Sequence, residues 1–98
     1  MSIKYLTLLF SLNAIAYCSN SSIQGHIIDT KSEEPLIGAN IILEDTMLGA
    51  ASDENGHYII TNVPIGSYTV RAMFIGYETL EKKIWIKNSK NYTIDIKL

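Results

Sequence analysis

Cysteine is almost absent from this chain of 98 residues, since Cys18 is the only one. A single cysteine excludes an internal disulfide framework, so the fold must be held together by packing alone. The net charge of −2 is small, and the chain lacks the basic surface that a nucleic-acid-binding protein needs to neutralise phosphates. The length allows one domain at most, which excludes an enzyme with separate cofactor and substrate domains.

Residues that could catalyse a reaction or hold a metal ion are equally sparse. His26 and His57 are the only histidines, and no cysteine or carboxylate stands beside them at metal-ligand spacing. We therefore predict no metal site and no cofactor, with both histidines on the solvated surface. Ser52 and Asp53 are neighbours in a predicted turn and form no catalytic triad. The stretch 53–55 resembles part of a calcium loop but lacks the distal glutamate. No catalytic residue is predicted, so we expect that the chain is not an enzyme.

The N-terminal residues contain the longest apolar run. Lys4 precedes a run from Tyr5 to Ala16 that ends in a small-x-small pattern. This arrangement is typical of a secretory signal peptide, and it is shorter than the roughly 20 apolar residues that span a membrane. We predict a signal-peptide helix at 1–16, with cleavage after Ala16, and expect the protein to be exported.

A polar segment follows the predicted cleavage site. We predict a flexible linker at 17–22 and a single domain at 23–98. The alternative is a lipoprotein signal, in which Cys18 is lipidated after cleavage directly before it. A lipidated cysteine usually follows a small residue, whereas Tyr17 stands there, so cleavage after Ala16 is the preferred interpretation.

The rest of the chain shows short apolar stretches with a period of two, separated by turn residues. This pattern predicts an all-β fold, a seven-stranded antiparallel β-sandwich. Residues 53–56 (DENG) are the clearest hairpin signal, because Asn-Gly readily adopts left-handed backbone conformations. The last two strands are expected to pair with each other as a hairpin. The predicted strands are 23–29, 39–44, 49–53, 57–61, 67–74, 79–87 and 91–98.

Strand alternation also separates the predicted core from the outer surface. The predicted core consists of Ile27, Ala39, Ile41, Leu43, Tyr58, Ile60, Tyr68, Val70, Ala72, Phe74, Ile84, Ile86, Ile94 and Ile96. Ile59, Met73 and Trp85 fall on the opposite face of their strands, which makes them candidate partner-binding residues. The alternative for Trp85 is ordinary cross-strand packing, with the stems of Lys83 and Lys87 covering the ring.

Several turn motifs occur in a characteristic order. They are Gly25-x-Ile27-x-Asp29, Pro35-Leu36-Ile37-Gly38-Ala39, Asp53-Glu54-Asn55-Gly56-x-Tyr58, Val63-Pro64-x-Gly66-x-Tyr68 and Gly76-Tyr77. This order closely resembles the carboxypeptidase-regulatory-like domain, a transthyretin-like sandwich, over residues 23–98. In bacteria, such domains resemble the N-terminal periplasmic extension of TonB-dependent outer-membrane receptors, including SusC-like glycan importers.

The resemblance implies a non-enzymatic interaction module in the periplasm or at the outer membrane of a Gram-negative bacterium. The chain would be a receptor fragment or a freestanding copy of the module, with a protein partner and no nucleic acid. One alternative is a freestanding cell-surface protein that binds carbohydrate or peptide and is lipid-anchored through Cys18. Another is an accessory domain that works beside a separate peptidase.

Overall fold

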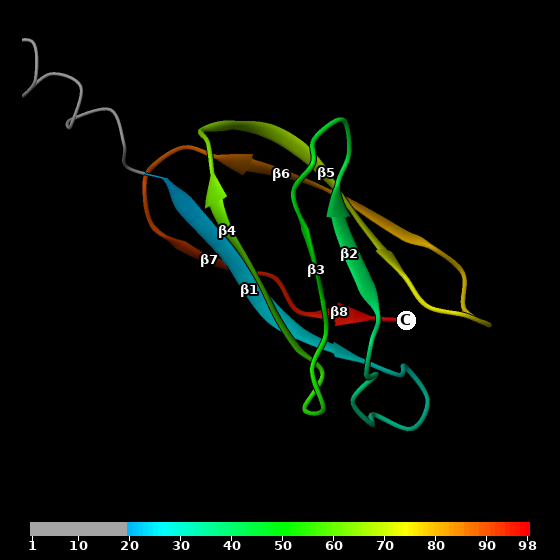
Figure 1. Ribbon diagram of the computed structural model, residues 1–98. Coiled ribbons are helices and arrows are strands. Elements are labelled where there is room, and N and C mark those ends of the chain that lie inside the picture. The colour runs from blue at the N-terminus through cyan, green and yellow to red at the C-terminus, as the bar shows by residue number, and fades with distance from the viewer. Residues whose placement is uncertain (1–19) are drawn as a thin grey trace, which may run out of the picture.

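The computed structural model describes residues 20–98, which fold into two packed β-sheets (Figure 1). One sheet has the order β4-β1-β7, with β8 also pairing to β1, and the other has the order β3-β2-β5-β6. The predicted β-sandwich is thereby confirmed. The strands are β1 (Ser21–Ile28), β2 (Asn40–Leu43), β3 (Gly49–Ala51), β4 (His57–Val63), β5 (Gly66–Met73), β6 (Leu80–Ile86), β7 (Asn91–Thr93) and β8 (Ile96–Lys97).

The predicted signal peptide and Cys18 lie outside the described residues. Across residues 20–98, no helix is long and apolar enough to cross a membrane. Ser21 and Ser22, which were expected in the linker, form the first two residues of β1 instead. The Ser21 hydroxyl is buried and donates a hydrogen bond to the Asn88 carbonyl at 2.6 Å, so this serine belongs to the folded domain.

Strand β1 is the centre of the first sheet. It pairs antiparallel with β4 and parallel with both β7 and β8, so this sheet is mixed rather than purely antiparallel. The described residues hold eight strands rather than seven, because the expected strand at 91–98 is interrupted between Thr93 and Ile96. Ile94 still donates its N–H to the Gln24 carbonyl at 2.8 Å, so the interruption stays attached to β1.

The predicted hairpin between residues 79–87 and 91–98 is wrong. β6 pairs with β5, whereas β7 pairs with β1 in the other sheet, so residues 87–90 cross from one sheet to the other. The crossing is held to the start of β1, where the Ser22 N–H donates to the Lys90 carbonyl at 3.2 Å. Period-two alternation shows which face of a strand is buried but not which strand lies beside it, and that limit explains the error.

The turn at Asp53–Gly56 forms as predicted but does not join paired strands. The Gly56 N–H donates to the Asp53 carbonyl at 2.9 Å, yet β3 and β4 on either side lie in different sheets. Gly56 has φ of 76°, and a β-carbon there would lie 2.6 Å from the Ile27 carbonyl oxygen. Glycine is therefore required both by the backbone conformation and by the close approach of β1.

Eleven of the fourteen predicted core residues are buried between the sheets. The other three, Tyr68, Phe74 and Ile84, are only partly buried and pack against the edge of the core. Three buried hydrophobic residues were not in the predicted core: Ile23, Leu36 and Val63. Val63 was assigned to a loop, but β4 continues to it, and Leu36 lies in a connection where no strand pattern marks the inward side.

Candidate functional site

Trp85 lies on the outer face of β6, at the free edge of the second sheet, and its side chain is 63% exposed. Its cross-strand neighbour on β5 is Ser67, and the next pair along is Thr69 with Lys83. Directly opposite residues in an antiparallel pair share a face, so the indole has two hydroxyls and an ammonium beside it. A shallow hollow of about 470 Å³ is lined by Ser67, Tyr68, Thr69, Lys83, Ile84 and Trp85.

Lysine also approaches the indole, as the packing alternative expected. The Lys87 Nζ lies 4.9 Å from the centroid of the Trp85 ring, within the range of a cation–π contact. This contact is worth about 0.5–1 kcal/mol at an exposed site, so a ligand could displace the flexible lysine at small cost. The indole is therefore partly covered by the Lys87 side chain and still accessible to a partner.

The structure does not bring Ile59 and Met73 to the tryptophan. Ile59 lies on β4, on the outer face of the other sheet, with 45% of its side chain exposed. Met73 ends β5 opposite Asn40 of β2, whereas Trp85 pairs near the start of β5, and the methionine is half-buried. The three candidate residues therefore form no common site, and only Trp85 lines a hollow.

Between Trp85 and Met73, the same outer face carries a short row of charges. The Arg71 Nε lies 3.6 Å from a Glu44 carboxylate oxygen and 3.4 Å from one of Glu81. These pairs are partly exposed and contribute little to stability individually. Arg71 and Glu81 form the next outward-facing pair after Thr69 and Lys83, so charged side chains border the Trp85 hollow on that side.

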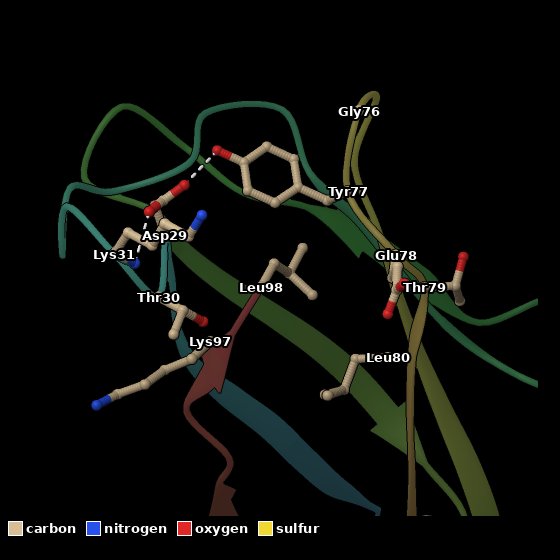
Figure 2. A pocket seen from close by; sticks show the side chains of 10 residues that line it. All are labelled: Asp29, Thr30, Lys31, Gly76, Tyr77, Glu78, Thr79, Leu80, Lys97 and Leu98. Carbon is tan, nitrogen blue, oxygen red and sulfur yellow. Dashed lines mark hydrogen bonds between the residues drawn. The ribbon is translucent and has the colours of Figure 1, made fainter.

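A second hollow, of about 690 Å³, opens at one end of the sandwich and contains the contact between Asp29 and Tyr77 (Figure 2). The Tyr77 hydroxyl donates a hydrogen bond to Asp29, whose other oxygen accepts from the N–H groups of Lys31 and Ser32. These bonds, that of Tyr77 foremost, lower the pKa of Asp29 to about 2 and raise the pKa of Tyr77. An aspartate with so many donors is a poor base, so the pair is a structural tie between the sheets.

Ser52 and Asp53 have structural roles. The buried Ser52 hydroxyl donates to the Leu36 carbonyl at 2.6 Å and accepts from the Ala39 N–H at 2.9 Å. Asp53 accepts hydrogen bonds from the N–H groups of Asn55 and His57, which lower its pKa and stabilise the turn. Neither side chain is available as a nucleophile or a base.

The two histidines, expected as separate surface residues, form a cross-strand pair between β1 and β4. Their ring centroids are 5.2 Å apart. Asp95 lies 3.9 Å from the Nδ1 of His26, and Asp53 lies 3.9 Å from the Nδ1 of His57. No sequence pattern predicted this pairing, because it depends on the register between two strands whose histidines are 31 positions apart. In the part of the chain that is described, no three His, Cys, Asp or Glu side chains are arranged to hold one metal ion.

These features define a β-sandwich module with an exposed tryptophan beside a shallow hollow. The model of the CarboxypepD_reg-like domain family matches residues 23–98, so the chain belongs to that family. The resemblance noted in the sequence is thus confirmed. A search of the curated proteins finds no match.

Solved structures share the fold at low sequence identity. A chain of a type II cohesin–X–dockerin complex from Acetivibrio cellulolyticus is 24% identical over 80% of this protein and 56% of its own length, with a TM-score of 0.65. A candidate carbohydrate-binding protein from Bacteroides uniformis is 21% identical over 81% and 41%, with a TM-score of 0.60. Another, from Pseudomonas aeruginosa, is 11% identical over 83% and 90%, with a TM-score of 0.59. This protein therefore spans 56% of the cohesin–X–dockerin chain and 41% of the Bacteroides uniformis chain.

Proposed function

We propose that the protein is an exported, non-catalytic interaction module whose partner binds the outer face of β5 and β6 around Trp85. The observation that carries the proposal is the 63% exposed indole beside a hollow on a regular sheet face. Large aromatic side chains dominate binding energy when a partner buries them, and a sheet holds such a side chain in a fixed position. Membership of the CarboxypepD_reg-like family and the nature of its structural neighbours support a binding role rather than catalysis.

The proposed compartment is the periplasm or outer membrane of a Gram-negative bacterium, in the manner of a TonB-dependent receptor's N-terminal extension. The signal-peptide pattern of residues 1–16 and the family resemblance support this proposal. Mass spectrometry of the protein from fractionated cells tests it. A periplasmic protein that begins at Tyr17 is the expected result, and a lipidated Cys18 would favour a lipid-anchored surface protein. A cytoplasmic protein that retains residues 1–16 would contradict export.

A glycan is the second candidate ligand, and the neighbours of Trp85 favour it. An indole can stack on the apolar face of a sugar ring, while the Ser67 and Thr69 hydroxyls and the Lys83 ammonium can hydrogen-bond to sugar hydroxyls. The presence of candidate carbohydrate-binding proteins among the structural neighbours adds to this interpretation. A protein partner would instead bury the indole together with more of the sheet face.

Two variants separate the Trp85 surface from the rest of the protein. Trp85→Ala removes the exposed indole, and Ile59→Ala removes an exposed apolar side chain from the opposite sheet. A photo-reactive amino acid at each position, introduced in the native host, tests for a protein partner. We expect cross-linking from position 85 and none from position 59. Equal cross-linking from both positions would remove the support for this surface.

Affinity electrophoresis in gels that contain xylan, pectin or glycogen tests the glycan. Retardation that Trp85→Ala abolishes and Ile59→Ala preserves would assign the ligand to the glycan class. If no polysaccharide retards the protein and position 85 yields no cross-link, the proposed binding surface is wrong.

A further inference from the structure

The two histidines occupy a specific kind of position in the first sheet. The Ile27 N–H donates to the Gly56 carbonyl at 2.8 Å, so Ile27 and Gly56 belong to a hydrogen-bonded pair. His26 and His57 are the next pair along the ladder and are therefore a non-hydrogen-bonded pair. In antiparallel sheets, side chains approach each other most closely at such pairs. The sheet register thus holds the two imidazoles side by side on the outer face.

The separation of the rings matches that of two ligands on one metal ion. With a metal–nitrogen distance of about 2.0–2.1 Å and tetrahedral angles, two imidazole centroids lie about 5 Å apart. The observed centroid distance is 5.2 Å, with the ring planes tilted by 59°. The centroid separation therefore fits two imidazoles that share one metal ion.

Each histidine has a carboxylate on its Nδ1 side. Asp95 and Asp53 lie 3.9 Å from the Nδ1 atoms of His26 and His57 respectively. Both carboxylates are held by the backbone, because Asp95 accepts the His26 N–H at 3.0 Å and Asp53 accepts the His57 N–H at 3.0 Å. At 3.9 Å these are close approaches and not hydrogen bonds. A turn of each ring would let its carboxylate accept the Nδ1 proton, which leaves the Nε2 lone pair free for a metal and orients the ring.

We propose that His26 and His57 form a two-histidine binding site for a borderline divalent metal ion. Asp53 and Asp95 act as positioning residues, and water completes the coordination sphere, because no third protein side chain in residues 20–98 converges on the site. Imidazole ligands suit Zn²⁺, Ni²⁺ and Cu²⁺, and Cu²⁺ binds most tightly in the general order of stability. The site lies on the opposite sheet from Trp85 and does not depend on the proposed function.

Titration calorimetry of the full mature protein with Cu²⁺ and Zn²⁺ at pH 7.5 tests the proposal. The protein must carry no histidine tag. We expect one ion per chain with micromolar affinity, tighter for Cu²⁺ than for Zn²⁺. His26→Gln and His57→Gln should each weaken binding by at least about tenfold. Asp95→Asn should weaken it by about 10-fold, since loss of an orienting carboxylate typically costs 10–100-fold in metal affinity.

Two control variants test whether other side chains of the protein bind the metal ion. Asp45→Asn removes an exposed carboxylate elsewhere and should leave the affinity unchanged. Cys18→Ser should also leave it unchanged, and loss of binding in that variant would assign the metal to the thiol and overturn the proposal.

Nuclear magnetic resonance with Cu²⁺ locates the ion independently of affinity. Paramagnetic broadening should centre on His26, His57 and their strand neighbours. Circular dichroism verifies that the histidine variants fold, which is expected because their side chains are 58% and 36% exposed. Broadening centred elsewhere, or variants that bind Cu²⁺ as tightly as the wild type, would overturn the proposed site.

Discussion

The two sheets of the sandwich bury their inward side chains to different extents. In β1 and β4, the inward residues Ile23, Ile27, Tyr58 and Ile60 are at most 2% exposed. On the β5–β6 side, Val70, Ala72 and Ile86 are buried as deeply, but four other inward side chains are only partly buried: Tyr68, Phe74, Leu80 and Ile84. We refer to the first sheet (β4-β1-β7 with β8) as the tight sheet and to strands β5 and β6 of the second sheet as the loose arm.

The difference follows from the arrangement of the strands. β1 has neighbours on both sides, since β4 lies on one edge and β7 and β8 lie on the other. The loose arm ends in the turn at 74–79, which extends beyond the neighbouring strands in Figure 1. Phe74 and Leu80 flank that turn, where fewer atoms of the other sheet can cover them, whereas Tyr68 and Ile84 pair with each other towards the opposite end of β5 and β6. The loose arm also carries the exposed aromatic surface on which the proposed function depends.

Glycine substitutions should separate the two halves most strongly. A β-carbon at Gly25 in the tight sheet would lie 1.9 Å from the Ile94 carbonyl oxygen, so Gly25→Ala must displace that backbone. We expect a loss of about 3 kcal/mol in the free energy of unfolding, at the upper end of overpacking costs. Gly76→Ala at the tip of the loose arm meets nothing within 4 Å and bears only the strain of φ at 86°. It should cost about 1–2 kcal/mol.

Urea denaturation followed by tryptophan fluorescence measures both glycine variants. The fluorescence of Trp85, the only tryptophan, reports the loose arm, whereas circular dichroism reports the strands of both sheets. If Gly25→Ala costs no more than Gly76→Ala, the tight sheet can relax around the added methyl group. The proposed contrast in packing would then be wrong.

Truncation of matched isoleucines gives the next largest effect. Ile60→Ala in the tight sheet removes a side chain that is 2% exposed and should cost about 2–3 kcal/mol, because it leaves a cavity. Ile84→Ala removes a partly buried side chain from β6, where solvent fills the space, and should cost about 1–2 kcal/mol. Equal losses in urea denaturation would show that the loose arm is packed as firmly as the tight sheet.

The contrast also explains what the sequence could predict. Alternation identified the inward residues of the tight sheet, such as Ile27 and Tyr58, because those strands are covered along their length. Alternation also predicted that Tyr68, Phe74 and Ile84 are fully buried, but they are only partly buried. A period of two shows which side of a strand faces inward and not how far the opposite sheet extends over it. Gly25 was noticed only as part of a motif, since its crowding arises from contact with a segment 69 positions away.

The same reasoning applies to the candidate sites. The exposed position of Trp85 follows from alternation within one strand, so the sequence could predict it. The pairing of the two histidines depends on the register between β1 and β4, and the approach of Asp95 depends on the parallel pairing after the crossover. Alternation within single strands cannot predict the register of β1 against β4, and the approach of Asp95 was missed because the final strands were assigned to each other rather than to β1.

Removal of single hydroxyl groups tests the contrast at finer resolution. The Tyr58 hydroxyl is buried and donates to the Ile94 carbonyl at 2.6 Å, while the Tyr68 hydroxyl donates to the Pro64 carbonyl at 2.7 Å in an exposed position. Tyr58→Phe leaves a buried carbonyl without its donor and should cost about 1–2 kcal/mol. Tyr68→Phe should cost less than about 0.5 kcal/mol, because water replaces the hydroxyl. Thermal and urea denaturation of the pair measure the difference.

The smallest effect concerns the tie that joins the loose arm to the loop after β1. The pKa of Asp29 is lowered from its ordinary value of 3.8 to about 2, mainly by the hydrogen bond from Tyr77. Because the folded-state pKa is the lower one, the stabilisation is complete above pH 3.8 and is lost as the pH falls towards 2. Carbon-13 titration of the Asp29 carboxyl should show its pKa rising in Tyr77→Phe, with Tyr92→Phe as the unaffected control.

Asp53 provides an internal reference for that titration. Its pKa is also lowered, but by the N–H groups of Asn55 and His57 in its own turn, so Tyr77→Phe should leave it in place. Loss of the tie should speed amide hydrogen exchange at the tip of the loose arm and leave β1 unchanged, because β1 is held from both sides. If exchange rises equally in both places, the tie stabilises the whole sandwich, and the two halves unfold as one cooperative unit.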